Sequence, residues 1–500
     1  MELFPSRILE ELELNKLDKK TAISNLLSLI SNSSNINKRL ESIKILKTIG
    51  IKGKEFFPFF ENLMISDSND RIRKIAIRII RKFFIDNAFE PMCWAYKHEE
   101  SIKCILEIIS TLSKINGSLT KEYLIKQLSE MEISKFREFI TNLNERNNLT
   151  SLSINELSEI LQNYHIVKYL LEKFKRIQYK LQNGRIYDLN LSFMIYNIYD
   201  PKVMGILPSF FKYLTNLHQL DLQLNKFTII PKSIIKLPVL KTLNLSNNHF
   251  RYLPEYFSQL TSLINLNLSY NDIRYLPKNF GELKDLESLD LKHNQLLKIP
   301  LTFKKLTCLK HLNLHGNKLE HIPNELFYLK GLIHLELGLN EIEDIPTEIT
   351  QLSSLQKLCL GGNCISPASF LTLMNMKRLS DLELYDNKLT MIPDNIRTKN
   401  RLKNLSLHNN RLEGLPTTFT RLNHLESLDL SWNNYTKFPE EISELTSLKF
   451  LNLSGNKITH IPSWIINLKN LRSLNLIYNK IHDQTDFLAK MEQHGISIQI

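Results

Sequence analysis

The chain has 500 residues, of which 43% are hydrophobic and 23% are charged, and its formal net charge is +12. This composition excludes a disordered chain, and the length exceeds what one hydrophobic core fills, so we expect two or more domains or a repeat array. The positive charge permits a nucleic-acid or acidic-membrane partner but does not require one, because both charge signs are interspersed along most of the sequence.

The cysteines and the N-terminus bear on the compartment. The five cysteines are odd in number and are not grouped as metal-ligand pairs: Cys93, Cys104, Cys308, Cys359 and Cys364. Such usage indicates a reducing compartment. The N-terminus lacks the basic and apolar regions of a signal peptide, and no apolar run reaches the ~18 residues of a membrane span. We therefore expect a cytoplasmic protein with no transmembrane segment.

Residues 1–182 show helical periodicity and predict an all-α domain. We expect helices near 18–31, 35–49, 55–66, 69–85, 101–115, 120–146 and 154–181, with Asp18, Asn69 and Ser153 as N-caps. Between Arg39 and Phe84 the chain resembles a HEAT repeat, on the residues Arg39, Ser42, Leu46, Gly50, Pro58, Asp70, Ile72, Arg73 and Ala76. The segment Lys168 to Lys180 is basic with an apolar stripe and predicts a helix that caps the first repeat of the following region.

A dense basic cluster falls inside the helix expected at 69–85. Its cations are Arg71, Arg73, Lys74, Arg78, Arg81 and Lys82, and its apolar stripe is Ile72, Ala76, Ile79 and Phe83. A solvated amphipathic helix explains this pattern. The alternative is that helix 71–82 binds nucleic acid, an anionic surface or an acidic partner, although no aromatic residues interleave the cations.

A motif L-x-x-L-x-L-x-x-N recurs twelve times from residue 217 onward. Its first leucine falls at Leu217, Leu240, Leu263, Leu286, Leu309, Leu332, Leu355, Leu379, Leu402, Leu425, Leu448 and Leu471. Every step is 23 residues except that from Leu355 to Leu379, which is 24. A fixed period of this kind is typical of stacked repeats that share a continuous core.

The positions within the motif predict its local structure. The leucines alternate as in a short strand with one buried face. The asparagine that follows, from Asn225 to Asn479, carries donors and acceptors that can satisfy buried backbone groups in a ladder. An Ile-Pro or Leu-Pro pair such as Ile230-Pro231 then starts the segment on the other side. Repeat 355–378 lacks this pair, is one residue longer and predicts a more regular helix.

This motif resembles the leucine-rich-repeat superfamily, and its 23-residue Ile-Pro form is similar to the intracellular Ras-group type. The fold expected is an α/β leucine-rich-repeat solenoid, a horseshoe with a parallel β-sheet on its concave face, preceded by an all-α HEAT-like helical domain. We expect a degenerate repeat or cap over 183–216, with an insertion within Phe193–Leu207, then repeats over 217–493 and a capping strand over 494–500. The disulfide-bonded cysteine caps of secreted relatives are missing from the sequence.

The concave face is where a partner is expected to bind. The residues between the second and third leucines of the motif form one column across the strands, called here the centre column. This column holds five acids and no base, which favours a basic patch on the partner. The neighbouring columns supply aromatic and imidazole side chains that the repeat does not require. The expected contact residues are Tyr270, Asp290, His315, His334, Glu336, Glu383, Tyr385, Asp386, His408, Asp429, Trp432, Phe450 and Tyr478.

These features predict a non-enzymatic protein-interaction scaffold or adaptor with no cofactor and no metal. His311 and His334 share a column, but that spacing follows automatically from the repeat and does not indicate a metal site. The sequence has no phosphate loop, kinase motif set or nucleophile elbow. The resemblance implies partners among small GTPases and their regulators. The alternatives are binding through helix 71–82, with nucleic acid unlikely as a partner, or a targeting subunit of an enzyme complex such as a ubiquitin ligase.

Overall fold

The computed structural model describes residues 4–51, 53–146, 148–174, 177–194, 209–230, 232–396, 401–482 and 485–500. The chain divides into two compact units. The first, called here the helical unit, comprises Met1–Lys175, Lys180–Ile186 and Phe210–Leu214, and the second, called the repeat unit, comprises Arg176–Tyr179, Tyr187–Ser209 and Thr215–Ile500. Among the described helices, none is both long enough and apolar enough to cross a membrane.

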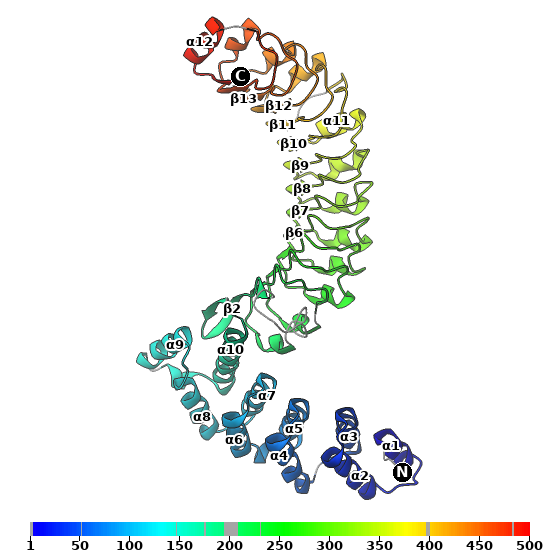
Figure 1. Ribbon diagram of the computed structural model, residues 1–500, viewed down its shortest axis with the longest axis vertical. Helices are drawn as coiled ribbons and strands as arrows, with labels where there is room; N and C mark the ends of the chain where they lie inside the picture. The colour runs from blue at the N-terminus through cyan, green and yellow to red at the C-terminus, as the bar shows by residue number, and fades with distance from the viewer. Residues whose placement is uncertain are drawn as a thin grey trace. The chain divides into compact units, whose positions relative to one another are not determined.

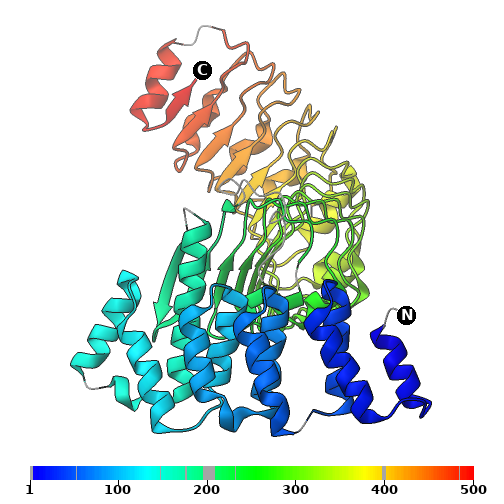
Figure 2. The ribbon, with the colours of Figure 1, turned by 60° about the horizontal axis from the view of Figure 1, so that its bottom comes forward.

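Residues 5–173 of the helical unit confirm the prediction of an all-helical N-terminal region. Its helices are α1 (Pro5–Glu13), α2 (Lys19–Asn32), α3 (Ile36–Ile49), α4 (Phe57–Ser66), α5 (Asp70–Phe83), α6 (Phe89–His98), α7 (Ile102–Leu112), α8 (Ser118–Ser129), α9 (Ser134–Glu145) and α10 (Ile154–Lys173). Successive helices pack as pairs, α2 with α3, α4 with α5 and α6 with α7, and lie side by side in Figure 2. The predicted N-caps Asp18, Asn69 and Ser153 each accept backbone N–H bonds at the start of a helix.

Several helix predictions are wrong in detail. The helix expected over 154–181 ends at Lys173, and Gln178–Gln182 forms strand β1, so Lys168 to Lys180 is not a continuous helix. The cause is a two-residue turn, Asn183-Gly184, in which both residues have positive φ, as a tight hairpin between β1 and β2 (Arg185–Asn190) requires. The helix expected over 120–146 is two helices, α8 and α9, and α1 and α6 were not predicted.

The repeat unit stacks one short strand per repeat. The strands are β3 (Gln219–Asp221), β4 (Thr242–Asn244), β5 (Asn265–Asn267), β6 (Ser288–Asp290), β7 (His311–Asn313), β8 (His334–Glu336), β9 (Lys357–Cys359), β10 (Asp381–Glu383), β11 (Asn404–Ser406), β12 (Ser427–Asp429), β13 (Phe450–Asn452), β14 (Ser473–Asn475) and β15 (Ser497–Gln499). They pair in parallel and in sequence order, with equivalent residues opposite one another, and β2 pairs with β3. Figure 1 shows the strands on the inner side of this curved stack and the helical segments on its outer side.

Burial explains the stacking. The central leucine of every strand from β3 to β14 is no more than 2% exposed. On the outer side most repeats have a short 3₁₀ helix after the proline, with its apolar side chain buried, as at Phe257 and Phe303. Repeat 355–378 instead has the α-helix α11 (Pro367–Met374), which confirms the prediction of a more regular helix there. Most of the insertion predicted within Phe193–Leu207 lies outside the described residues.

The predicted asparagine ladder is present, and Asn340 shows its pattern. Its Nδ2 donates to the carbonyl of Leu337 in the same repeat at 2.9 Å and to that of Leu314 in the preceding repeat at 3.0 Å. Its Oδ1 accepts from the backbone N–H of Leu319 at 3.1 Å. Each asparagine therefore satisfies backbone groups of two repeats at once, which locks adjacent repeats together inside a buried turn.

Candidate binding face of the repeat sheet

The side chains on either side of the buried strand leucine point away from the core. In each strand from β3 to β14 the first and third residues flank the central leucine, and the third is part-buried in all but one strand. Together with the second and third residues after each strand they form the surface called here the concave face, on the strand side of the curved stack in Figure 1. The buried leucines and asparagines fix the backbone of this face, whereas the repeat does not require any particular side chain at these positions.

The thirteen predicted contact residues occupy four positions of this face. Asp290, Glu336, Glu383 and Asp429 are third residues of strands, and His334 and Phe450 are first residues. Two residues after a strand ends lie His315, Tyr385 and His408, and three residues after it lie Tyr270, Asp386, Trp432 and Tyr478. The set spans β5 to β14, and its members do not all lie together. The structure brings them into smaller groups on adjacent strands.

The most connected group lies on β8, β9 and β10. Lys357 of β9 reaches between Glu336 of β8 and Glu383 of β10, with its Nζ 3.3 Å from a carboxylate oxygen of each. Cys359, also of β9, is buried, and its Sγ lies 3.9 Å from the hydroxyl of Tyr385. We call Glu336, Lys357, Cys359, Glu383 and Tyr385 the Lys357 cluster.

The carboxylates of the Lys357 cluster stabilise the charged form of its lysine. Burial disfavours the charged form of Lys357, but the carboxylates of Glu336 and Glu383 outweigh it and raise the pKa of the ammonium. Burial raises the pKa of the Cys359 thiol to about 12, and the negative charge of Glu383 adds to this. The thiol is therefore protonated at neutral pH and is neither an activated nucleophile nor a ready metal ligand.

Donor atoms of Glu336, Cys359 and Glu383 do lie within 4.8 Å of one another, a spacing that could hold a metal ion. The Lys357 ammonium, however, already forms an ion pair with each of the two carboxylates. A protonated thiol beside an ammonium makes a poor donor set for a divalent cation. The cluster is better described as a paired-carboxylate site filled by a side chain of its own chain.

Large side chains on the concave face rest against glycines. A Cβ on Gly361 would lie 2.3 Å from the Tyr385 ring, and one on Gly455 would lie 2.7 Å from the Trp432 ring. Leu339 covers Gly362 in the same way. The residue before each ladder asparagine has positive φ whether it is glycine, as Gly455 at +66°, or not, as Trp432 at +54°. Glycine at these positions therefore provides space for a neighbouring side chain.

Aromatic side chains remain exposed on this face. Trp432 is 56% exposed and Tyr478 is 74% exposed, and their ring centroids lie 6.0 Å apart, across Gly455 of the intervening repeat. Phe450 is 49% exposed between Ser427 and Ser473, its partners in strand register. The Tyr385 ring stacks on His408 with centroids 4.8 Å apart and planes at 13°. Exposed apolar rings held in fixed positions are typical of protein-binding surfaces.

The predicted histidines form pairs. The rings of His311 and His334 lie 4.7 Å apart, with their Nδ1 atoms separated by 3.1 Å. Burial, the neighbouring His334 and Lys310 together lower the pKa of His311. Burial and the nearby charge of Lys292 lower the pKa of His315. His311 and His315 are therefore neutral at neutral pH and present polar, uncharged contacts.

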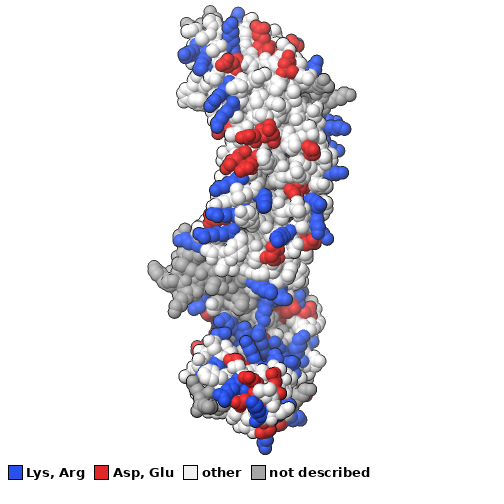
Figure 3. All heavy atoms as spheres, turned by 90° about the vertical axis from the view of Figure 1, so that its right-hand side faces the viewer, with Lys and Arg blue, Asp and Glu red and all other residues white. Residues whose placement is uncertain are grey.

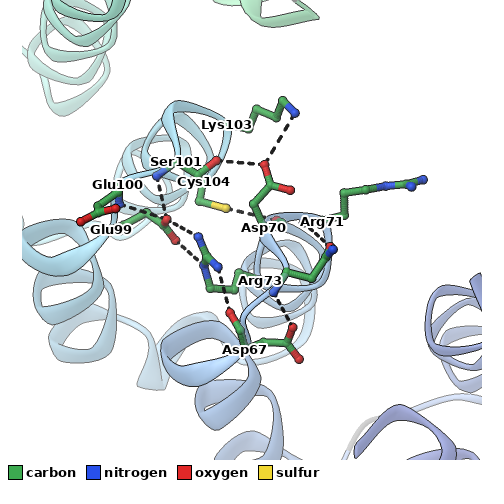
Figure 4. A network of polar contacts seen from close by, with 10 residues as sticks. Asp67, Asp70, Arg71, Arg73, Glu99, Glu100, Ser101, Lys103 and Cys104 are labelled. Carbon is green, nitrogen blue, oxygen red and sulfur yellow. Dashed lines mark hydrogen bonds and ion pairs between the residues drawn. The ribbon is translucent and has the colours of Figure 1, made fainter. Parts of the chain in front are cut away.

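Three of the six cations in the basic cluster of the helical unit form ion pairs within that unit. Arg73 donates to Glu99 at 2.6 and 2.8 Å, within the polar network of Figure 4. Arg78 and Arg81 both bind Glu107, which is 1% exposed. Half of the six cations thus have carboxylate partners, which reduces the charge available to an outside phosphate.

The predicted stripe of this helix is only partly correct. Ile72, Ala76 and Ile79 are buried, whereas Phe83 is partly exposed. Ile77 and Ile80 are buried as well, because α5 packs against both α4 and α7.

On the face of the protein in Figure 3, basic and acidic side chains both occur along the repeats, so the outer side of the repeat unit has no single sign of charge.

Sequence reasoning missed Lys357, Cys359, Gly361 and Gly455 as parts of the candidate site. From the centre column only acidic residues were predicted as contacts, and Lys357 belongs to the column beside it. A usable signal was present for the glycines, because each replaces a larger residue at a position that other repeats fill with serine, asparagine, tyrosine or tryptophan. A glycine at such a position, next to a large aromatic residue of the adjacent repeat, indicates that the aromatic ring lies across the glycine.

Comparisons with known proteins agree with this architecture. A leucine-rich-repeat family model matches residues 203–250, 253–296 and 300–365, and a leucine-rich-repeat-region model matches residues 393–493. The chain is a member of the leucine-rich-repeat family, with an all-helical region before its repeats. No curated protein matches its sequence.

Solved structures of the same fold come from several sources. A leucine-rich-repeat protein of Leptospira interrogans is 28% identical, over 62% of this chain and 95% of that one, with a TM-score of 0.49. An internalin of Listeria monocytogenes is 23% identical, over 64% and 91%, with a TM-score of 0.51. The Toll–Spätzle complex of Drosophila matches at 26% identity over 59% and 45%, with a TM-score of 0.49. The likeness to the internalin shows the fold alone.

Proposed function

We propose that the protein is a non-enzymatic scaffold or adaptor that binds partner proteins on the concave face of its repeat sheet. The observation that carries this proposal is the set of exposed or partly exposed aromatic rings that the repeat does not need. Trp432 and Tyr385 both lie against a glycine that leaves room for the ring. A ring already held in place loses little conformational entropy on binding, which favours its use as an anchor.

The chemistry of the surrounding face supports a protein partner. Carboxylates, imidazoles, hydroxyls and aromatic rings alternate along the strands, a mixture that suits the polar and apolar contacts of protein interfaces. The five cysteines are all unpaired thiols, which supports a cytoplasmic location for the proposed scaffold. The likeness of the repeats to the intracellular Ras-group type makes small GTPases and their regulators the first partners to test.

The alternative of binding through helix 71–82 has less support. Arg73, Arg78 and Arg81 already bind carboxylates of the same unit. A phosphate-driven interaction would weaken steeply as salt rises from about 50 to 200 mM. Contacts anchored by aromatic rings on the concave face would persist over that range.

Affinity capture with identification of the bound proteins tests the proposal. The test variant replaces Tyr385, Trp432 and Phe450 with alanine, and the expected result is loss of the partners that the wild type retains. The matched control replaces three exposed tyrosines outside the concave face, Tyr252, Tyr275 and Tyr328, with alanine. If the test variant keeps the same partners as the wild type, the concave-face proposal is wrong.

A further inference from the structure

Two carboxylates of the Lys357 cluster come together from strands that are not neighbours. Glu336 lies on β8 and Glu383 on β10, with β9 between them. Adjacent strands lie about 4.8 Å apart, so these two backbones are separated by about 10 Å. Carboxylate oxygens of the two side chains nevertheless lie within 4.8 Å of each other. Like charges approach this closely where a cation lies between them.

The cation is the side chain of Lys357, which extends from the first position of β9. The third position of β9 holds Cys359, whereas the same position holds an acid or an asparagine in most other strands. The short side chain of Cys359 leaves room for the glutamates to converge above it. The side chains of Lys357, Glu336 and Glu383 are 37%, 26% and 34% exposed, so another molecule can reach all three.

Aromatic and charged groups around this site favour a cationic ligand. The Tyr385 ring is packed between Gly361 and His408, and its hydroxyl, 3.9 Å from the Sγ of Cys359, can accept a hydrogen bond from a cation held by the carboxylates. With histidine neutral, the first and third residues of β8 to β12 carry a net charge of −3, although the whole chain carries +12. The charged members are Glu336, Lys357, Asp381, Glu383 and Asp429.

We infer that this part of the concave face receives an arginine or lysine side chain of a protein partner, and that Lys357 occupies the same position until the partner displaces it. The inference rests on the proposed function and names the chemistry of the contact. A partner guanidinium can bind both carboxylates with parallel N–H bonds and donate a further N–H to the Tyr385 hydroxyl. Lys357 then turns into solvent on its flexible stem. Lys357 is thus a competitor of the partner.

Because Lys357 competes with the partner for the carboxylates, substituting Lys357 and substituting the two glutamates are expected to change binding in opposite directions. A fluorescein-labelled oligo-arginine peptide serves as the probe, with binding followed by fluorescence anisotropy. Removing the internal cation with Lys357→Met is expected to tighten binding about fivefold, because both carboxylates become available. The double variant Glu336→Gln and Glu383→Gln is expected to weaken binding about tenfold, because the probe loses both carboxylates.

Matched controls separate this site from general charge. Glu341→Gln with Glu343→Gln removes the same charge from an exposed turn after β8, and Lys310→Met removes an exposed lysine that pairs with Glu287. Both controls are expected to change binding less than twofold, and thermal melting checks that every variant is folded. Equal weakening by the two glutamine pairs would overturn the inference. So would unchanged or weaker binding by the Lys357→Met variant.

The outcome is independent of the test of the proposed function. If the glutamine pair at 336 and 383 still captures the partners that the aromatic triple variant loses, the proposed function stands and this inference fails. If the aromatic triple variant loses nothing, the proposed function fails whatever the probe does. Loss of the partners in both variants supports both.

Discussion

The two units of the protein satisfy their buried polar groups by different means. In the repeat unit, neutral asparagine amides bond to backbone groups, as Asn340 does with Leu314 and Leu337. In the helical unit, charged side chains meet across helices, as Arg78 and Arg81 of α5 meet Glu107 of α7. A repeat offers the same backbone groups at every turn, so a short neutral side chain suffices. A unit without that regularity uses long charged side chains that span the gap between helices.

Replacing a ladder asparagine is expected to have the largest effect on stability. The Asn340→Leu change keeps the volume but removes one of the two asparagine bonds to each of the Leu314 and Leu337 carbonyls and leaves the buried Leu319 N–H without a partner, at a cost of about 4 kcal/mol in the free energy of unfolding. Urea unfolding followed by circular dichroism measures the loss. Asn265→Leu is the control, because this asparagine is exposed and bonds only to the Thr242 hydroxyl. Equal losses in the two variants would contradict the assigned role of the ladder.

Acid is expected to weaken the helical unit through His165. Its Nε2 lies 2.6 Å from the hydroxyl of Tyr96, and burial, reinforced by the charge of Lys168, lowers its pKa to about 4. The unfolded chain takes up this proton near pH 6.5, before the folded chain does. The free energy of unfolding therefore falls as the pH drops from 6.5 to 4, by on the order of 3 kcal/mol. The repeat-unit ladder contains only neutral amides and adds nothing to this slope.

The check is the pH dependence of thermal melting in the wild type and in His165→Gln. Glutamine can keep a hydrogen bond to Tyr96 but does not titrate. The variant is expected to lose most of the slope between pH 6.5 and 4. A variant with the full slope would show that the pH dependence comes from other groups.

Removing the charge of Glu107 is expected to cost about 2 kcal/mol at pH 7, because Arg78, Arg81 and Lys212 then lose their shared carboxylate. This cost is smaller than that of breaking a fully buried pair, because the three cations remain partly solvated. Burial opposes ionisation of Glu107, but its bond to Arg78 and the neighbouring cations outweigh this and lower its pKa to about 2. Its stabilisation is therefore complete above about pH 4.5 and disappears as the pH falls through 2.

Glu107→Gln is the test variant, and chemical unfolding at pH 7 is the measurement. Glu11→Gln is the control in the same unit, because Glu11 pairs with Arg7 at the surface. An exposed pair of this kind contributes less than about 0.5 kcal/mol. If the two variants are equally stable, the Glu107 ion pairs do not hold the helices together.

The sequence predicts the repeat unit better than the helical unit for a physical reason. Leucine and asparagine positions recur every 23 residues, so each repeat confirms the others, and strands and ladder follow from one template. The bonds of Glu107 join residues 26 and 29 positions apart, and no periodicity points to them. The Lys357 cluster is predictable from the sequence only in part. Its glutamates fall on a predicted column, but the convergence of Glu336 and Glu383 depends on side-chain conformations that no pattern encodes.

Substituting one glycine in each unit is expected to have the smallest effects on stability. Gly117 of the helical unit has φ +151° and ψ 157°, a conformation essentially restricted to glycine, and a Cβ there would have no atom within 4 Å. Gly117→Ala is therefore expected to cost about 1 to 2 kcal/mol through backbone strain alone. Gly455 has φ +66°, close to the +53° of Asn409 at the same repeat position. Its backbone therefore accepts asparagine, whose Cβ meets the Trp432 ring.

Gly455→Asn is accordingly expected to change the free energy of unfolding by less than about 1 kcal/mol while displacing Trp432. Trp432 fluorescence measures the displacement once Trp94 and Trp464 are replaced by phenylalanine. A shift in emission with little loss of stability means that this glycine shapes the binding face, and capture of partners should then fall as it does for Trp432→Ala. An unchanged emission would mean that the position of Trp432 does not depend on Gly455. The role of Gly455 would then be conformational, as that of Gly117 is.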